Sequence, residues 1–204
     1  MQVVHYFDYK SPYAYLAQAQ TFALETEFDI RVDIQPYTLD IPAYLGAAEL
    51  DADNQDTIGS RNAHQWRRVR YSYMDCRREA NRRGLTIRGP RKIFDSSLAH
   101  IGFLFAKHQE CFRAYHDYVF EKFWKRDLDI ERMEVVEGAL RECGVETTDF
   151  ANYVESTGRT EHDTLRSQAE SEFGVFGVPS YVVQGELFWG AERLELVRER
   201  LAQG

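Results

Sequence analysis

Hydrophobic and polar residues alternate in a way that predicts strand, helix and strand in the first forty residues. Residues 3–7 (VVHYF) are β-branched and aromatic, as in a buried strand. Ser11 and Pro12 are typical of a helix start, because serine caps the first turn and proline lacks an amide hydrogen that this turn leaves unpaired. Apolar residues then recur at helical spacing up to Ala23, and residues 30–34 alternate as in a half-buried strand.

The last thirty residues predict two strands followed by a helix. Residues 181–183 (YVV) and 187–189 (LFW) flank Gln184-Gly185, a short turn in which glycine favours a positive φ. Residues 194–201 carry leucine and valine at helical spacing. The two ends together give β-α-β and then β-β-α, the connectivity of a thioredoxin-like sheet, so the predicted fold class is α/β.

The region between these ends has helical periodicity. Apolar residues at steps of three, four or seven run from Leu98 to Phe123 and predict one long amphipathic helix. We therefore expect a thioredoxin-like domain formed by residues 1–41 and 174–204, with a large all-helical insertion at residues 42–173.

Composition indicates a globular protein. The 204 residues are 44% hydrophobic and 14% aromatic, which is enough for a packed core. Apolar runs stay short of the roughly 18 residues that a membrane span needs, and the start lacks signal-peptide features, so we expect a cytoplasmic protein without membrane contact. Cys76, Cys111 and Cys143 form no C-x-x-C pair, which argues against a disulfide scaffold, a zinc ribbon and thiol oxidoreductase chemistry.

Charge is distributed unevenly along the chain. The net charge of -8 argues against general nucleic-acid binding, yet residues 67–92 contain ten basic and two acidic residues, a local +8. This segment is either a solvated helix face or a wall for a small carboxylate ligand, since arginine pairs with carboxylates in bidentate geometry. A non-catalytic module that binds an anionic partner or nucleic acid through residues 67–92 is the alternative of another class.

Two loops carry candidate chemistry. Residues 8–12 (DYKSP) lead from strand to helix, where a hydroxyl lies beside free N–H groups at the positive end of the helix dipole. Ser11 there either only caps the helix or forms part of an anion site. The Val178–Pro179 bond is either cis, leaving the Val178 backbone free to pair with an extended ligand, or an ordinary trans bond at a strand start.

Three histidines recur every eight residues, at His100, His108 and His116. On one helix eight residues turn by about 800°, so successive side chains drift by about 80° and share no face. We therefore expect no metal site.

Two motifs carry a family resemblance. Residues 7–17 (FDYKSPYAYLA) and 176–194 (FGVPSYVVQGELFWGAERL) resemble the signatures of 2-hydroxychromene-2-carboxylate isomerases, relatives of kappa-class glutathione transferases in the DsbA-like thioredoxin group. The similarity runs nearly end to end. In that family the serine of an S-P motif replaces the thioredoxin C-x-x-C nucleophile, and here SPYA, starting at Ser11, contains no thiol.

The resemblance implies glutathione as cofactor, a small aromatic carboxylate as substrate, and a homodimer. Ser11 would be the catalytic residue and would favour the glutathione thiolate, because a hydroxyl donor and a helix N-terminus lower the pKa of a thiol. Reversible thiolate addition would open the ring of 2-hydroxychromene-2-carboxylate and allow bond rotation, and elimination would release trans-o-hydroxybenzylidenepyruvate. A kappa-class-like transferase that conjugates small electrophiles is the alternative within the same fold.

The resemblance also assigns the glutathione contacts. The main chain of Val178, before Pro179, would pair with the cysteinyl backbone. Ala191 and Glu192 would lie at the γ-glutamyl end, where the family has G-[SNQ]-D-R and this chain has GAER.

The remaining assignments come from the basic segment and the first loop. Asn62, or alternatively Asn54, corresponds to an upstream asparagine that binds the cofactor. Arg68 stands where a lysine is common and would bind a carboxylate. Lys10 would place positive charge near the thiolate or face solvent, and Tyr13 would wall an aromatic substrate or pack in the core.

Overall fold

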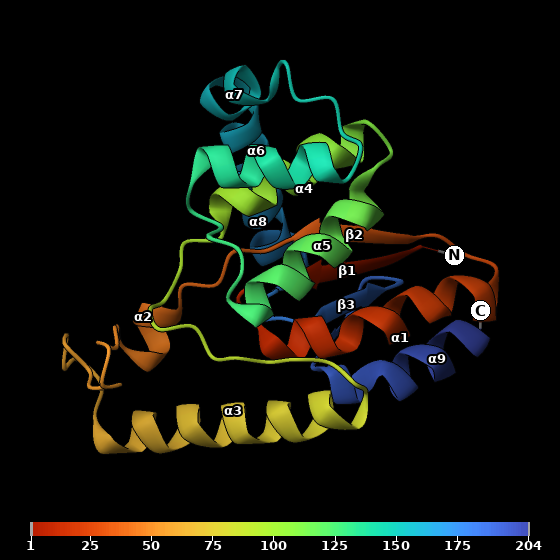
Figure 1. Cartoon of the computed structure of the whole chain (residues 1–204). Helices are drawn as coiled ribbons and strands as arrows, with labels where there is room; N and C mark the ends of the chain where they lie inside the picture. Colours follow the sequence, from red (N-terminus) through yellow and green to blue (C-terminus); the bar gives the residue numbers. More distant parts are fainter. Residues whose placement is uncertain (1, 204) are drawn as a thin grey trace.

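The computed structural model describes residues 2–203 and shows a mixed sheet between two groups of helices (Figure 1). The chain begins with β1 (Val3–Phe7), α1 (Pro12–Phe28) and β2 (Val32–Pro36). It ends with β3 (Ser180–Val183), β4 (Glu186–Trp189), the 3₁₀ turn η2 (Ala191–Arg193) and α9 (Leu194–Ala202). Between them come α2 (Ile41–Leu45), α3 (Ala63–Arg82), α4 (Ser97–His108), α5 (Phe112–Lys125), α6 (Met133–Glu142), α7 (Phe150–Tyr153), the π-helical turn η1 (Val154–Gly158) and α8 (Arg159–Phe173).

The sheet has the order β2-β1-β3-β4. Strand β1 is parallel to β2 and antiparallel to β3, which is antiparallel to β4. Gln184 and Gly185 both have positive φ, 52° and 81°, as a two-residue hairpin turn of the primed type requires. This connectivity confirms the thioredoxin-like fold predicted from the two ends of the chain.

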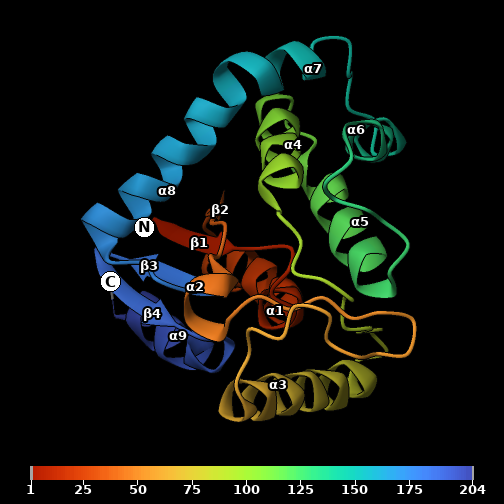
Figure 2. The same ribbon diagram turned by 90° about the vertical axis from the view of Figure 1, so that its left-hand side faces the viewer.

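Helices cover the sheet on both sides. In Figure 1, α1 and α9 lie side by side below the strands, and α4 and α6 lie above them, while α8 packs against β2. Helix α3 packs against α1 and extends along the edge of the molecule (Figure 2). Within the described part of the chain, no helix combines the length and the apolar character that crossing a bilayer requires.

The prediction of one long helix from Leu98 to Phe123 is wrong. Helix α4 ends at His108 and α5 begins at Phe112, and the two pack against each other. The break lies at Glu110, which adopts a φ of 58°, and the Cys111 N–H turns back to the Ala106 carbonyl at 2.9 Å. A left-handed residue of this kind ends a helix even when it is not glycine. Apolar residues recur at helical spacing on both sides of the break because each helix buries one apolar face, with Ile101 and Phe105 on α4 and Tyr115, Val119 and Phe123 on α5.

His100, His108 and His116 therefore do not lie on one helix, so the turn of about 800° between them does not describe their positions. His100 on α4 and His116 on α5 both lie against the Phe7 ring, with centroids 5.4 Å and 4.3 Å away. Both are buried, whereas the exposed His108 pairs with Glu161. Two of the three histidines therefore belong to the aromatic core between β1 and the helices α4 and α5.

Candidate functional site

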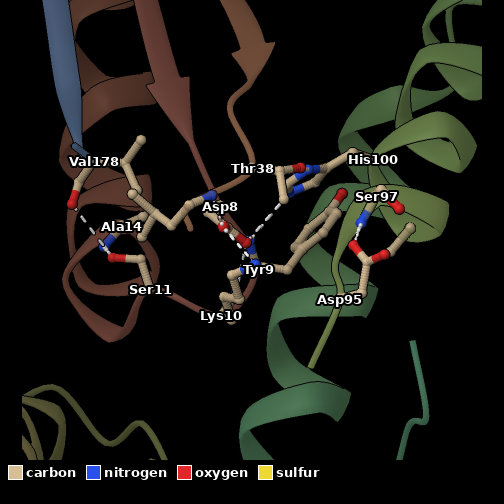
Figure 3. Close-up of polar contacts among 12 residues, drawn as sticks. Asp8, Tyr9, Lys10, Ser11, Ala14, Thr38, Asp95, Ser97, His100 and Val178 are labelled. Atoms are coloured by element: carbon tan, nitrogen blue, oxygen red, sulfur yellow. Dashed lines mark hydrogen bonds and ion pairs between the residues drawn. The ribbon is translucent and has the colours of Figure 1, made fainter. Parts of the chain in front are cut away.

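Ser11 caps α1 at the end of the β1–α1 loop. Its Oγ accepts a hydrogen bond from the Ala14 N–H at 3.2 Å and donates to the Val178 carbonyl at 3.4 Å (Figure 3). Most hydroxyl hydrogen bonds are shorter, about 2.7–2.8 Å. The Ser11 proton is therefore held loosely and can turn to a stronger acceptor. Since Pro12 has no N–H and Ala14 donates to Ser11, the Tyr13 amide is the first-turn donor left for a ligand.

The Val178–Pro179 peptide bond is cis, one of the two forms that the sequence left open. Val178 lies beside Ser11 and contributes to the same cavity. The Pro179 carbonyl accepts a hydrogen bond from the Gly190 N–H at 2.9 Å, so η2 is anchored to this turn.

Lys10 and Asp8 form a buried ion pair next to Ser11. The Lys10 Nζ lies 3.5 Å from Asp8 Oδ2, and their side chains are 5% and 0% exposed. Asp8 also accepts hydrogen bonds from the N–H groups of Lys10, at 3.0 Å, and Leu39, at 2.8 Å. Burial opposes ionisation of Asp8, but the Lys10 ammonium, His100 and the Leu39 amide outweigh it and hold the pKa of this carboxyl well below its usual range.

A chain of polar contacts continues from Asp8 away from the loop. His100 Nε2 lies 3.5 Å from Asp8 Oδ1, and its Nδ1 lies 2.7 Å from the Thr38 hydroxyl (Figure 3). Thr38 contacts His162 Nε2 at 2.8 Å, and His162 Nδ1 reaches Asp163 at 2.9 Å. Burial lowers the pKa of His100, so its imidazole is neutral at neutral pH. This polar chain, defined as Asp8, His100, Thr38, His162 and Asp163, links the loop to α4 and α8.

A cavity of about 670 Å³ opens beside Ser11. It lies between the start of α1, α2, α3 and the segment 89–94, and this volume is typical of small-molecule sites. Four of the predicted residues line it: Lys10, Ser11, Tyr13 and Val178. Four further lining residues, Arg70, Arg77, Arg91 and Lys92, belong to the basic segment 67–92. The sequence did not predict the other charged or aromatic lining residues, namely Tyr44, Arg61, Trp66, Tyr73, Phe94 and Arg126.

The other predicted site residues lie off this cavity wall. Asn62 caps α3, where its side chain and that of Gln65 bond reciprocally to each other's backbone N–H groups. Asn54 is exposed in the loop before α3. Arg68 is exposed on α3 and is not among the described residues that line the cavity.

Pro179 and the predicted residues of η2 form a second group that is absent from the described lining of the cavity. Ala191 is half-buried and Glu192 is exposed, and neither appears among the described lining residues. The Glu192 carboxylate folds back over Gly190, within 2.6 Å of the position a Cβ would take there. A Cβ at position 190 would displace this flexible, exposed carboxylate, and it is the φ of 111° that favours glycine there.

The three cysteines are free thiols, and none of them is among the described residues that line the cavity. Burial raises the pKa of Cys76 to about 12 and that of Cys143 to about 11. Thiols with such pKa values are protonated at neutral pH and are poor nucleophiles. Neither therefore provides the reactive thiolate of a thiol oxidoreductase.

The fold and the first-turn site define the class: this chain belongs to the DsbA-like thioredoxin domain family, whose model matches residues 2–202. A 2-hydroxychromene-2-carboxylate isomerase from Sphingobium xenophagum is 26% identical over 198 residues, 96% of this chain and 95% of that protein. A solved structure of such an isomerase superposes with a TM-score of 0.72 at 23% identity, covering 100% of this chain and 95% of the other. A probable DsbA oxidoreductase from Streptomyces coelicolor gives a TM-score of 0.76 at 18% identity, covering 100% and 89%. The same fold therefore occurs among proteins named for different reactions, and the site must decide the chemistry.

Proposed function

We propose that this protein is a glutathione-dependent isomerase that converts 2-hydroxychromene-2-carboxylate-type substrates to trans-o-hydroxybenzylidenepyruvate. The observation that supports it most is the Ser11 hydroxyl, which lies at a helix N-terminus on a cavity of about 670 Å³ whose described lining residues include no cysteine. A site built to favour a thiolate but lacking a thiol needs one from a bound molecule. The relatives named as isomerases support this class of reaction.

The residues at this end of the cavity suit such a molecule. Glutathione, when bound, would supply the thiolate that adds reversibly to the double bond of the substrate. Ser11 would turn its proton from the Val178 carbonyl to the sulfur, and the Tyr13 N–H and helix dipole would add positive potential. The buried Lys10 ammonium lies on the same wall and would stabilise negative charge that develops on the substrate.

Removing the Ser11 hydroxyl should raise the pKa of the bound thiol. We expect Ser11→Gly to lose about 1–3 kcal/mol of thiolate stabilisation, or roughly one to two pKa units, because a hydrogen bond to a charged group is lost. Glycine is chosen since it costs only a few tenths of a kcal/mol as an N-cap. The measurement is the ultraviolet absorbance of the thiolate during pH titration of the glutathione complex, with turnover recorded in parallel.

Ser11→Thr is the matched control, since it keeps both the hydroxyl and the helix cap. It should retain a bound-thiol pKa near that of the unmodified protein. An unchanged pKa in Ser11→Gly would reduce Ser11 to a helix cap and remove the main support for this function.

The product distinguishes the isomerase from a kappa-class-like transferase. The isomerase returns free glutathione after each turnover, whereas the transferase accumulates a conjugate. Incubation with a limiting amount of glutathione decides between them: turnover beyond one equivalent supports isomerisation, and turnover that stops at one equivalent supports conjugation.

A further inference from the structure

The charged side chains that line the cavity beside Ser11 are all positive among the described residues. Among residues 2–203, those that line it include no aspartate or glutamate but seven cations: Lys10, Arg61, Arg70, Arg77, Arg91, Lys92 and Arg126. The chain as a whole carries a net charge of -8, so this concentration of positive charge is local. A cavity lined by one sign of charge raises the local concentration of oppositely charged ligands.

Two of these cations are neutralised within the protein. Lys10 pairs with Asp8, and Lys92 pairs with Glu131. Within residues 2–203, none of the five arginines of the wall has a carboxylate within the 4.0 Å that defines an ion pair. Their charges are available to a ligand.

Backbone carbonyls hold some of these arginines in place. The Arg61 Nε donates to the carbonyls of Leu45, at 3.1 Å, and Gly46, at 3.0 Å. The Arg126 Nε donates to the Gly89 carbonyl at 2.8 Å. Neutral acceptors fix a guanidinium without cancelling its charge, so the wall is preorganised for anions.

Aromatic side chains line the same wall. The Arg61 guanidinium lies over the Trp66 ring, 5.0 Å from its centroid, and the Lys92 ammonium lies 4.7 Å from the centroid of Phe94. Tyr73 also faces the cavity. A flat aromatic ligand with acidic substituents matches this alternation of π-surfaces and cations.

The charge balance indicates how many acidic groups that ligand carries. Glutathione in its thiolate form has a net charge of about −2 at neutral pH, from two carboxylates, one thiolate and one ammonium group. A monocarboxylate substrate would bring the total to about −3. The five unneutralised arginines exceed that charge.

Resting on the proposed function, we propose that the substrate of this cavity is a 2-hydroxychromene-2-carboxylate-type bicycle that bears a second carboxylate on its aromatic ring, which its product retains. The second carboxylate pairs with the exposed Arg70 and Arg77 on α3, the arginines of the wall for which the described residues provide no hydrogen-bond acceptor. Neutral aromatic electrophiles and monocarboxylates leave these two guanidinium groups without a counter-charge.

The test is calorimetric titration of the full chain, saturated with glutathione, with naphthalene-2-carboxylate and naphthalene-2,6-dicarboxylate. We expect the dicarboxylate to bind about 5–10-fold more tightly at low salt, since each exposed ion pair contributes up to about a factor of five. Its advantage should shrink as salt is raised. Equal affinity of the two probes, or tighter binding of the monocarboxylate, would overturn the inference.

Variants on α3 tie the preference to named residues. The double variant Arg70→Gln/Arg77→Gln should reduce the dicarboxylate advantage to about twofold or less, while Arg67→Gln, an exposed position of the same helix outside the described lining residues, should keep it. An advantage that survives the double variant counts against the assignment of these arginines. Titration with glutathione alone tests the proposed function separately, because absence of glutathione binding would refute that function whatever the ratio of the two probes.

Discussion

Acidification from about pH 6.5 to 5.5 is expected to destabilise this protein by about 2–3 kcal/mol, because unfolding then takes up about two protons on average. Burial lowers the pKa of His5 from 6.5 to about 3, despite an opposing backbone hydrogen bond to Ser180. Burial, helped by neighbouring positive charges, lowers the pKa of His116 well below 6.5, and that of His100 is also lowered. His5 and His116 are neutral in the folded protein across this window, His100 takes up its proton at a lower pH than in the unfolded chain, and all three titrate near 6.5 when unfolded. The stability is therefore fully present above about pH 6.5 and is lost as the pH falls below it.

The measurement is urea unfolding at a series of pH values within this window, which lies above the range in which carboxylates titrate. The variant His116→Phe, at a position surrounded by Phe7, Phe103 and Phe120, should lower the slope of stability against pH by about one proton. His64→Gln, on the exposed side of α3, is the control and should not change the slope. A flat profile for the unmodified protein would contradict the prediction.

Replacing Asp8 by alanine should lower the free energy of unfolding by about 3–5 kcal/mol at neutral pH. The substitution leaves the Lys10 ammonium buried without its counter-charge, and removing one partner of a buried pair has effects of this size. It also removes the acceptor of the Leu39 N–H, which is 2.8 Å from Asp8 Oδ2. Denaturant unfolding measures the change.

The double variant Asp8→Asn/Lys10→Met separates the charge from the hydrogen bonds. Asparagine keeps one oxygen acceptor for the backbone and methionine removes the unpaired ammonium, so we expect more than half of the lost stability to return. A loss below about 1 kcal/mol in Asp8→Ala would mean that water reaches Lys10 and that the pair is not effectively buried.

The two ends of the chain could be predicted because their signals are local. Strand β1, the Ser11 cap and the Gln184-Gly185 turn each depend on residues within a few positions of one another. The break between α4 and α5 could not, because Glu110 in a left-handed conformation carries no glycine or proline signal. Its position is set by how the two helices pack, which periodicity does not encode.

The candidate site was predictable only where it lies in one of the two motifs. Lys10, Ser11, Tyr13 and Val178 reach one cavity because the β1–α1 loop and the cis-proline turn are adjacent at one end of neighbouring strands. Arg126, at the end of α5, lines the cavity next to segment 89–94, where it donates a hydrogen bond to the Gly89 carbonyl. Only the tertiary structure reveals that these two segments meet. The basic composition of residues 67–92 was a usable signal, and it supplies Arg70, Arg77, Arg91 and Lys92, although the exposed Arg68 is not among the described lining residues.

The polar chain from Asp8 to Asp163 has a consequence for how the molecule unfolds. His100 and His162 are contributed by α4 and α8, while Asp8 and Thr38 follow the strands β1 and β2. Detaching the helices would break these hydrogen bonds, each worth about 0.5–1.5 kcal/mol net, and would expose the apolar surface that α4 and α8 bury. Sheet and helices should therefore lose structure in one cooperative transition, and a fragment that joins only the two chain ends should not be stable alone.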